Sequence, residues 1–378
     1  MSVVSGVARR RWATVSAGAA LLVAAVAFAP GVVAGVRAGA GGGAPPPRQL
    51  LDRARDSGGV AFAALAQSRG TLGLPDLPRF GSVAALLGGT TRARVWWAAP
   101  ASWRVDVVSA TGEQGTYGSR DGIVTWDYER NTLVTVVGEP GARLPRADDL
   151  LAPEATRRLL AGVGPSDRVT ALPATDVAGR SAYGLRVVPT DPRSTIARAD
   201  LWVDQRTALP LRLRVVARSG EDALVSELSD VRLGAPAPTV LRPPGPPGAE
   251  VDVQVAPDLV AAIDQNPRFA LPDTVAGLPV TRSLLQGTAT YGRGLVRFSV
   301  LPLPERTARD VLANARSAGA APVEVTGGEA VTVASSLLNA VIARDDDRHA
   351  YLIAGLVTPD VLAQAARELL ADPPPRLS

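Results

Sequence analysis

The chain has 378 residues, a formal net charge of +4 and no cysteine. Without cysteine it forms no disulfide, no thiolate zinc site and no acylated-cysteine anchor, and with His349 as its single histidine it lacks the usual His-rich metal sites. Residues 1–44 hold four arginines and no acid, so 36 of the 40 basic residues remain to balance 36 acidic ones. This neutral body gives nucleic-acid binding no electrostatic support.

The N-terminal segment resembles an export signal or membrane anchor. Arg9, Arg10 and Arg11 precede an uncharged, apolar run of 25 residues at positions 12–36, which is long enough to span a bilayer as a helix. The arginines favour a cytoplasmic N-terminus and place everything after about residue 40 outside the membrane. Ala27–Ala29 has the pattern of a cleavage site but is followed by Pro30. A retained anchor and a cleaved signal peptide both stay open.

Alternating apolar residues predict antiparallel strands in the body that follows a Gly/Pro-rich spacer. Gln49–Arg55 is predicted as a short helix, and from Gly59 onward the pattern has period two. Three strands each present one apolar face, formed by Trp103, Val105 and Val107, by Val124, Trp126 and Tyr128, and by Leu211, Leu213 and Val215. Further strands are predicted over Thr91–Trp97, Thr132–Val137, Ala182–Pro189, Ala197–Asp204 and Ala223–Leu233.

One helix is predicted within this strand-rich part, over Ala147–Gly162, and Leu72–Gly89 is predicted as a loop or partial helix. The proline-rich stretch Pro236–Pro247 predicts a domain boundary. We therefore expect three parts: a membrane anchor or signal peptide with its spacer at 1–44, a β-domain at 45–245 and a second domain at 246–378.

The second domain has a mixed α/β pattern. Helices are expected over Ala256–Ile263, over Glu305–Ala318 and from Thr358, as N-cap, to Leu370. Strands are expected over Gly294–Leu301, Ala330–Ser335, Leu337–Ala343 and Ala350–Val357, the last two joined by a polar turn at 344–348.

No set of residues predicts catalysis or metal binding. His349 has no nucleophile-elbow serine to serve, and Asp345–Asp347 lacks the spaced oxygen ligands and the glycine of a calcium loop. Gly287–Gly294 lacks the Gly-Lys-Ser/Thr end of a phosphate loop. We expect no enzyme, no metal and no cofactor.

Five of the six tryptophans lie on predicted strands of the first domain. They either fill its core or line an apolar cavity that takes an acyl chain, because periodicity does not distinguish a filled sheet from a hollow one. The candidate ligand-binding residues are Trp103, Trp126, Tyr128 and Trp202.

Several motifs of the first domain occur in the order found in the LolA-like superfamily. Val124–Asn131 (VTWDYERN) resembles its Trp-x-Tyr strand and turn, and Leu201–Leu213 (LWVDQRTALPLRL) resembles its Trp-Val-Asp hairpin. Leu228–Leu233, followed by Pro236, is similar to its closing strand. The resemblance covers about residues 48–245.

The second domain resembles the C-terminal domain of the RseB/MucB family. The similar segments are Leu271–Leu278 (LPDTVAGL), Tyr291–Val300 (YGRGLVRFSV), Ala330–Val333 and Tyr351–Val357 (YLIAGLV). Gly292-Arg293 replaces the Ser-Asp pair that recurs in that family.

This resemblance implies a mainly β fold with α+β character: a LolA-like curved antiparallel half-barrel with a helical lid, followed by a small α/β C-terminal domain. It implies an extracytoplasmic sensor that binds a lipid or lipoprotein acyl chain and a membrane anti-sigma factor. The candidate partner-binding residues are Tyr291, Gly294, Leu295 and Phe298. A lipid or lipoprotein carrier without a signalling partner is the alternative, and an exported hydrolase is a third class.

Overall fold

The computed structural model describes residues 44–71, 86–109, 112–138, 145–245, 247–255, 269–282, 288–347 and 349–375. The predicted anchor, most of the predicted loop Leu72–Gly89 and the predicted helix Ala256–Ile263 lie outside these ranges. Within them, no helix has the length and apolar character needed to cross a membrane.

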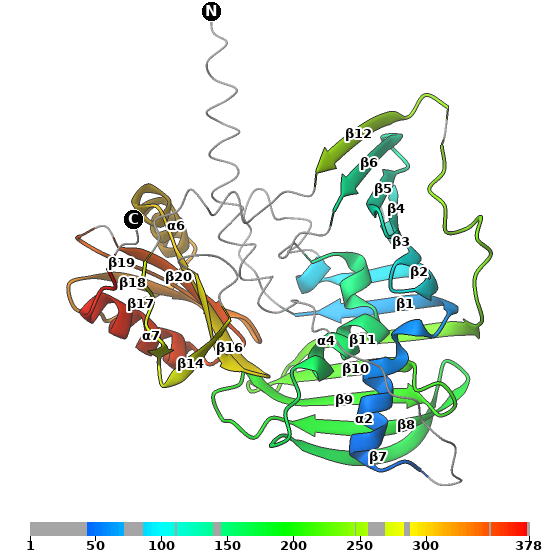
Figure 1. The fold of residues 1–378 in the computed structure, drawn as a ribbon, viewed down its shortest axis with the longest axis horizontal. Coiled ribbons are helices and arrows are strands. Elements are labelled where there is room, and N and C mark those ends of the chain that lie inside the picture. Colours follow the sequence, from blue (N-terminus) through cyan, green and yellow to red (C-terminus); the bar gives the residue numbers. More distant parts are fainter. Residues whose placement is uncertain are drawn as a thin grey trace, which may run out of the picture.

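Twelve strands form the first sheet, in the order β12-β6-β5-β4-β3-β2-β1-β11-β10-β9-β8-β7 (Figure 1). Neighbouring strands are antiparallel, except that β12 runs parallel to β6. The sheet stays open, so the mainly β, half-open class predicted from the sequence is confirmed. The strands are β1 Phe62–Gly70, β2 Thr90–Ala99, β3 Ser102–Ser109, β4 Gly112–Gly118, β5 Gly122–Asp127, β6 Thr132–Val137, β7 Arg168–Val177, β8 Arg180–Val188, β9 Ile196–Asp204, β10 Pro210–Ala217, β11 Asp222–Leu233 and β12 Glu250–Val255.

Helices cover one face of this sheet, which we call the inner face; the opposite face is the outer face. Leu50 and Leu51 of α2 (Pro47–Arg55) and Leu160 of α4 (Ala152–Ala161) share a buried apolar cluster with Leu201 and Leu213. The alternation of the strands therefore buries every second side chain against helices.

The helix predicted over Ala147–Gly162 is two shorter pieces, η2 (Ala147–Leu150) and α4. Leu151 between them is extended, with ψ 138°. Pro153 explains the break, because it has no amide hydrogen to continue a helix through this point and is tolerated only in a first turn.

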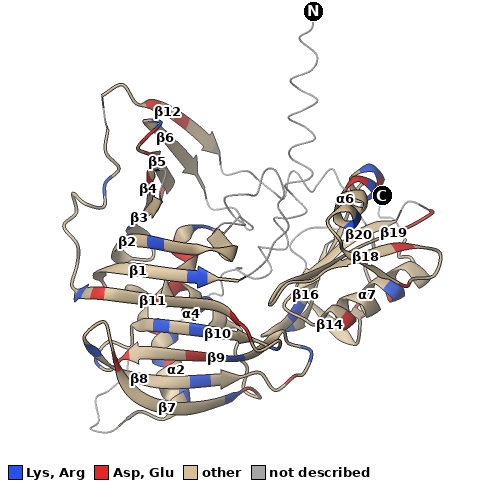
Figure 2. Cartoon of the chain, turned by 180° about the vertical axis from the view of Figure 1, so that it is seen from behind, with Lys and Arg blue, Asp and Glu red and all other residues tan. Residues whose placement is uncertain are grey.

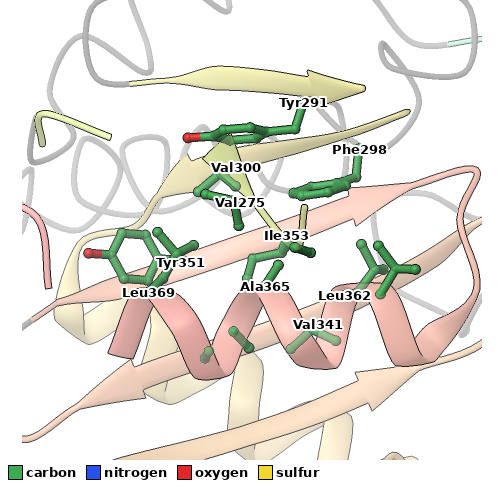
Figure 3. Packing of buried hydrophobic residues seen from close by; sticks show 14 of the residues in the cluster. Val275, Tyr291, Phe298, Val300, Val341, Tyr351, Ile353, Leu362, Ala365 and Leu369 are labelled. Atoms are coloured by element: carbon green, nitrogen blue, oxygen red, sulfur yellow. The ribbon is translucent and has the colours of Figure 1, made fainter. Parts of the chain in front are cut away.

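Eight strands form the second sheet, in the order β13-β14-β15-β16-β20-β19-β18-β17. Alternate residues of β19 and β20 face α7 (Pro359–Ala371) on one side and α6 (Glu305–Ser317) on the other. Figure 3 shows Leu362, Ala365 and Leu369 of α7 packed against the first of these sides. The strands are β13 Thr274–Val275, β14 Leu278–Arg282, β15 Ala289–Arg293, β16 Val296–Pro302, β17 Ala321–Val323, β18 Gly328–Val333, β19 Asn339–Asp345 and β20 Ala350–Gly355.

Two details of the second unit differ from the expectations. Thr358 occupies the N-cap position of α7, but its side chain makes no capping hydrogen bond. Strand β12, which lies within the predicted second domain at 246–378, pairs with β6 of the first sheet. In chain order, the proline-rich stretch is therefore followed by β12, which still belongs to the first sheet, and not by β13, the first strand of the second sheet.

The two sheets are joined by buried contacts. Leu295 and Leu337 of the second unit pack into the apolar cluster formed by the inner face of the first sheet with α2 and α4. The Ser194 hydroxyl donates to the Leu295 carbonyl at 3.1 Å, and the Thr195 hydroxyl donates to the Leu337 carbonyl at 2.7 Å.

Candidate functional site

Trp103 fills the core of the inner face. Its ring stacks on Trp97 at a centroid distance of 6.1 Å, and Trp97 stacks on Phe62 at 6.4 Å. The Trp103 indole N–H donates to the Pro100 carbonyl at 3.1 Å, and the residue is 3% exposed. This part of the inner face is therefore packed solid.

A hollow lies beside this aromatic stack, between η2 and strands β1 and β2. Small side chains line it on the sheet, and Ala147, Leu150 and Leu151 line it on the helix side. The sheet residues are Ala66, Ser68, Thr91 and Ala93. It is shallow, with room for the centre of a water-sized sphere in only about 10 Å³.

The inner face continues past Trp103 onto β5 and β6 with apolar side chains that are only half-buried. Ile123 pairs with Val136 across these strands, and Thr125 pairs with Val134. The described helices of the first unit make their main contacts with β2, β3, β7, β10 and β11. Ile123, Val134 and Val136 form what we call the inner strip. Ile123 packs against the core around Trp103, and no described helix makes a main contact with β5 or β6.

Trp126 and Tyr128 lie on the outer face, stacked with ring centroids 3.8 Å apart. The Tyr128 hydroxyl accepts a hydrogen bond from Arg104 at 2.9 Å. Arg104 also donates twice to Asp106, at 2.8 and 2.6 Å, and lies over the rings of Trp96 and Tyr117.

The Arg104–Asp106 pair is a buried structural ion pair. Asp106 is 0% exposed. Burial lowers the pKa of Arg104, but the hydrogen bond to Asp106 raises it, and the net pKa lies above the usual value. Arg104 also donates to the Val240 carbonyl at 3.4 Å, which attaches the proline-rich connector to the outer face.

The four candidate ligand-binding aromatics do not surround one cavity. Trp202 pairs with Arg212 on the outer face, where the guanidinium lies 5.4 Å from the indole centroid. Trp103 thus faces inward, while Trp126, Tyr128 and Trp202 face outward. Ligand binding by these residues stays a prediction, and Trp103 is the member that borders the inner face.

Of the four candidate partner-binding residues, Tyr291, Leu295 and Phe298 are buried within the chain and Gly294 is half-buried. Tyr291 and Phe298 stack at 5.3 Å in the core beneath α7, and the Tyr291 hydroxyl donates to the Pro272 carbonyl at 2.7 Å (Figure 3). Gly294 and Leu295 contact the first unit at Gly162. Partner binding by these residues stays a prediction, but their side chains already serve the core and the junction between the sheets.

The single histidine is engaged with one carboxylate. His349 Nδ1 lies 2.6 Å from an Asp345 carboxylate oxygen, and the His349 amide donates to the other oxygen at 2.7 Å. No group of three or more residues suited to hold a metal ion occurs in the described ranges. The pair closes the β19–β20 hairpin.

The hollow, and the side of the sheet on which each aromatic residue lies, do not follow from the predicted strands. The hollow depends on the small residues Ala66 and Ala93, which pair across β1 and β2. The alternation of Ala64, Ala66 and Ser68 on β1 was the available signal, because small residues at every second position of a strand cannot fill the space above it.

No protein-family profile and no curated protein sequence matches this chain. Among solved structures, it is similar to MucB in complex with MucA(peri), at 18% identity and TM-score 0.46, over 85% of this chain and 97% of that chain. The MucA/MucB complex of Pseudomonas aeruginosa is similar at 18% identity and TM-score 0.45, over 84% and 96%. A LolA superfamily protein from Nitrosomonas europaea is similar at 15% identity and TM-score 0.25, over 53% and 99%.

These structures belong to the family and superfamily whose motifs the sequence resembles, so the predicted resemblance is confirmed. At 18% identity or less and TM-scores below 0.5, the likeness decides nothing about ligand or partner. Those questions depend on the geometry of this chain.

Proposed function

We propose that this chain is an extracytoplasmic sensor that binds an acyl chain of a lipid or lipoprotein on the inner face of the first sheet. The observation that supports this proposal is the inner strip, where Val134 and Val136 stay half-buried on β6, a strand with which no described helix makes a main contact, beside Ile123 at the border of the core. Apolar side chains on a sheet face that is otherwise covered by helices fit an apolar ligand.

The size of the hollow limits how such a ligand would lie. As it stands, the hollow has about 10 Å³ for the centre of a water-sized sphere, which is room for about one water molecule. This is far below the roughly 300–1,000 Å³ of ordinary ligand pockets. An acyl chain would therefore lie along the inner strip, and it would enter the space beneath η2 only if η2 moved. Each methylene that leaves water there contributes about 0.8 kcal/mol.

We further propose that the protein partner is a membrane anti-sigma factor. The support is the motif resemblance to the RseB/MucB family together with an arginine-flanked apolar segment at 12–36, which would hold the body outside the membrane. A ligand shifts partner affinity only as far as it binds the two states of the protein unequally. η2 lies above the inner face. A sensor of this kind therefore requires that the acyl chain bind more tightly to one position of η2 than to another.

Native mass spectrometry with lipid extraction, on the full-length chain purified from its own host, tests the ligand. We expect co-purified acyl species, lost in Val134→Asp, because a carboxylate on the inner strip opposes burial of an alkyl chain. Thr135→Asp is the matched control, since it lies next in β6, is equally half-buried and points to the outer face. An empty, folded protein, or equal lipid loss in both variants, would contradict the proposal.

A lipid or lipoprotein carrier without a signalling partner is the alternative. A carrier has to leave the membrane, whereas a sensor bound to a membrane protein does not. Cleavage of the N-terminal segment in the host, read from the mass of the mature chain, would favour the carrier. Retention of the segment would favour the sensor.

A further inference from the structure

Three of the four sheet edges in the described ranges are protected against pairing with another strand. At one edge of the first sheet, β7 contains Pro173 and a register shift between Leu172 and Thr175. In the second sheet, edge strand β13 has two residues, and edge strand β17 has three with Pro322 in the middle. Short strands, prolines and bulges are the devices by which proteins prevent edge pairing.

The fourth edge, β12, has no proline and no bulge, and its only edge protection is the charge of Glu250 and Asp252. Its six residues pair with β6 in a single unbroken register, without proline or bulge. No other described strand pairs with β12, which forms the end of the first sheet (Figure 1). Its remaining backbone groups are therefore a template for a further strand.

The outer side of this edge is apolar and exposed. Val251 is 63% exposed, Val253 is 66% exposed, and Val137 on β6 is 44% exposed. These are three of the six exposed large hydrophobic residues in the described ranges. Because exposed apolar residues gathered at one place indicate an interaction surface, this edge differs from the rest of the sheet.

The inner side of the same strand is acidic. Glu250 and Asp252 alternate with the valines, and Figure 2 shows their red bands on β12. Neither carboxylate has a cationic partner among the described residues; Asp252 accepts one hydrogen bond, from the Gln254 amide at 2.6 Å. A strand beside β12 would thus meet valines on one face and, on the other, carboxylates that have no cationic partner among the described residues.

We propose that the free edge of β12 binds an extended segment of a partner protein, in which apolar residues alternate with Lys or Arg. The segment adds to the sheet as a further strand, with its apolar side chains beside Val251 and Val253 and its cations beside Glu250 and Asp252. Main-chain hydrogen bonds supply affinity and the alternation supplies specificity. The inference rests on the proposed function only in assigning this segment to the membrane protein partner.

A second copy of this chain fits the edge less well. If two β12 strands paired antiparallel with matching faces, Asp252 would meet Asp252 or Glu250 of the other copy in two of the three registers, and Gln254 in the third. Like charges directly opposite one another destabilise strand pairing. The acidic inner side therefore favours a basic partner over self-association.

The test measures binding of a fluorescent peptide of alternating Val and Arg to the full-length protein in non-ionic detergent, by anisotropy. A peptide of the same composition with all Val before all Arg is the composition control. We expect the alternating peptide to bind about tenfold more tightly than the control, and Val253→Pro to lose about tenfold, because proline removes a ladder donor from β12. Asp252→Arg should reverse the preference toward a Val–Glu peptide, while Asp310→Arg on α6 should not.

Hydrogen exchange gives the second readout. Bound peptide should slow amide exchange at 250–255 and leave 168–177 in the protected edge strand unchanged. Equal affinity of the unaltered chain and Val253→Pro, both with the same far-UV circular dichroism, would overturn the proposal. A concentration-dependent dimer that is abolished by Val253→Pro would show that the edge binds a second copy of this chain, and would overturn the proposed partner segment. No acyl ligand enters these measurements, so their failure is distinct from failure of the lipid test.

Discussion

Gly162 and Gly294 meet backbone to backbone at the junction between the two sheets. A Cβ at residue 294 would lie 2.6 Å from the Gly162 carbonyl oxygen, and Gly294 has a φ of +63°. A Cβ at residue 162 would lie 2.9 Å from the end of the Leu295 side chain. The first contact involves only backbone and cannot relax locally, whereas the second involves a side chain that can move.

Gly294→Ala should therefore destabilise the protein more than Gly277→Ala. Both positions have left-handed backbone, with φ +63° and +66°, but nothing lies within 4 Å of a Cβ at residue 277. Gly277→Ala measures the cost of left-handed backbone alone, about 1–2 kcal/mol. Any additional loss of stability in Gly294→Ala comes from the close backbone contact at the junction. Thermal unfolding by circular dichroism measures both; equal shifts in Tm would show that the junction opens without cost.

Trp103→Phe should lower stability by about 1 kcal/mol more than Trp126→Phe. Each change removes an indole, but only the Trp103 N–H has a hydrogen-bond acceptor, the Pro100 carbonyl. The Trp126 N–H is buried and has no partner among the described residues. Loss of a donor that has no acceptor costs little stability. Urea unfolding of the two variants therefore shows how much the hydrogen bond of Trp103 contributes. A larger effect at Trp126 would contradict this.

Asp204→Asn should destabilise the protein by about 3 kcal/mol near neutral pH, because it breaks a buried ion pair with Arg180. Burial raises the pKa of Asp204, but hydrogen bonds from Arg180 and Thr207 lower it below the usual value. A carboxyl with a lowered folded-state pKa stabilises the fold above its unfolded pKa of about 3.9 and loses that contribution as pH falls through its folded value.

The stability difference between Asp204→Asn and the unaltered chain should thus shrink as pH falls from 6 to below the unfolded pKa. Urea unfolding at a series of pH values measures it. Asp230→Asn, at a side chain that is 61% exposed, is the control, and we expect no resolved change there. A difference that stays constant with pH would show that the Asp204 carboxylate is not the source.

Ser226→Ala should loosen η2 over the hollow. The Ser226 hydroxyl is buried and donates to the Leu150 carbonyl at 2.6 Å. Its removal leaves that carbonyl without this partner, at a cost of about 1–3 kcal/mol. We expect faster amide exchange at 147–151 and no change at 305–317 in α6. Uniform acceleration across the chain would instead indicate global destabilisation.

Alternation of apolar and polar residues predicts strands correctly at places such as Trp103–Val107. It does not predict β4 and β7, because the glycines of β4 and the mostly exposed residues of β7 show no such pattern. Strand β12 was not predicted either, although Glu250–Val255 alternates throughout. Likewise, alternation showed that Val124, Trp126 and Tyr128 share a face. It could not show that this face lies opposite Trp103, because that depends on the register between β3, β4 and β5.

By itself, then, the sequence determined a neutral, cysteine-free, β-rich body behind an arginine-flanked apolar segment, since charge, composition and period-two burial are local properties. Pairing between distant residues decided the rest. The parallel contact of β12 with β6 joins residues more than a hundred positions apart. It creates the open edge of the first sheet, and it extends that sheet past the predicted boundary at residue 245. The meeting of Gly162 with Gly294 is equally non-local. No local pattern specifies such contacts, because their free energy exists only once both partners have folded.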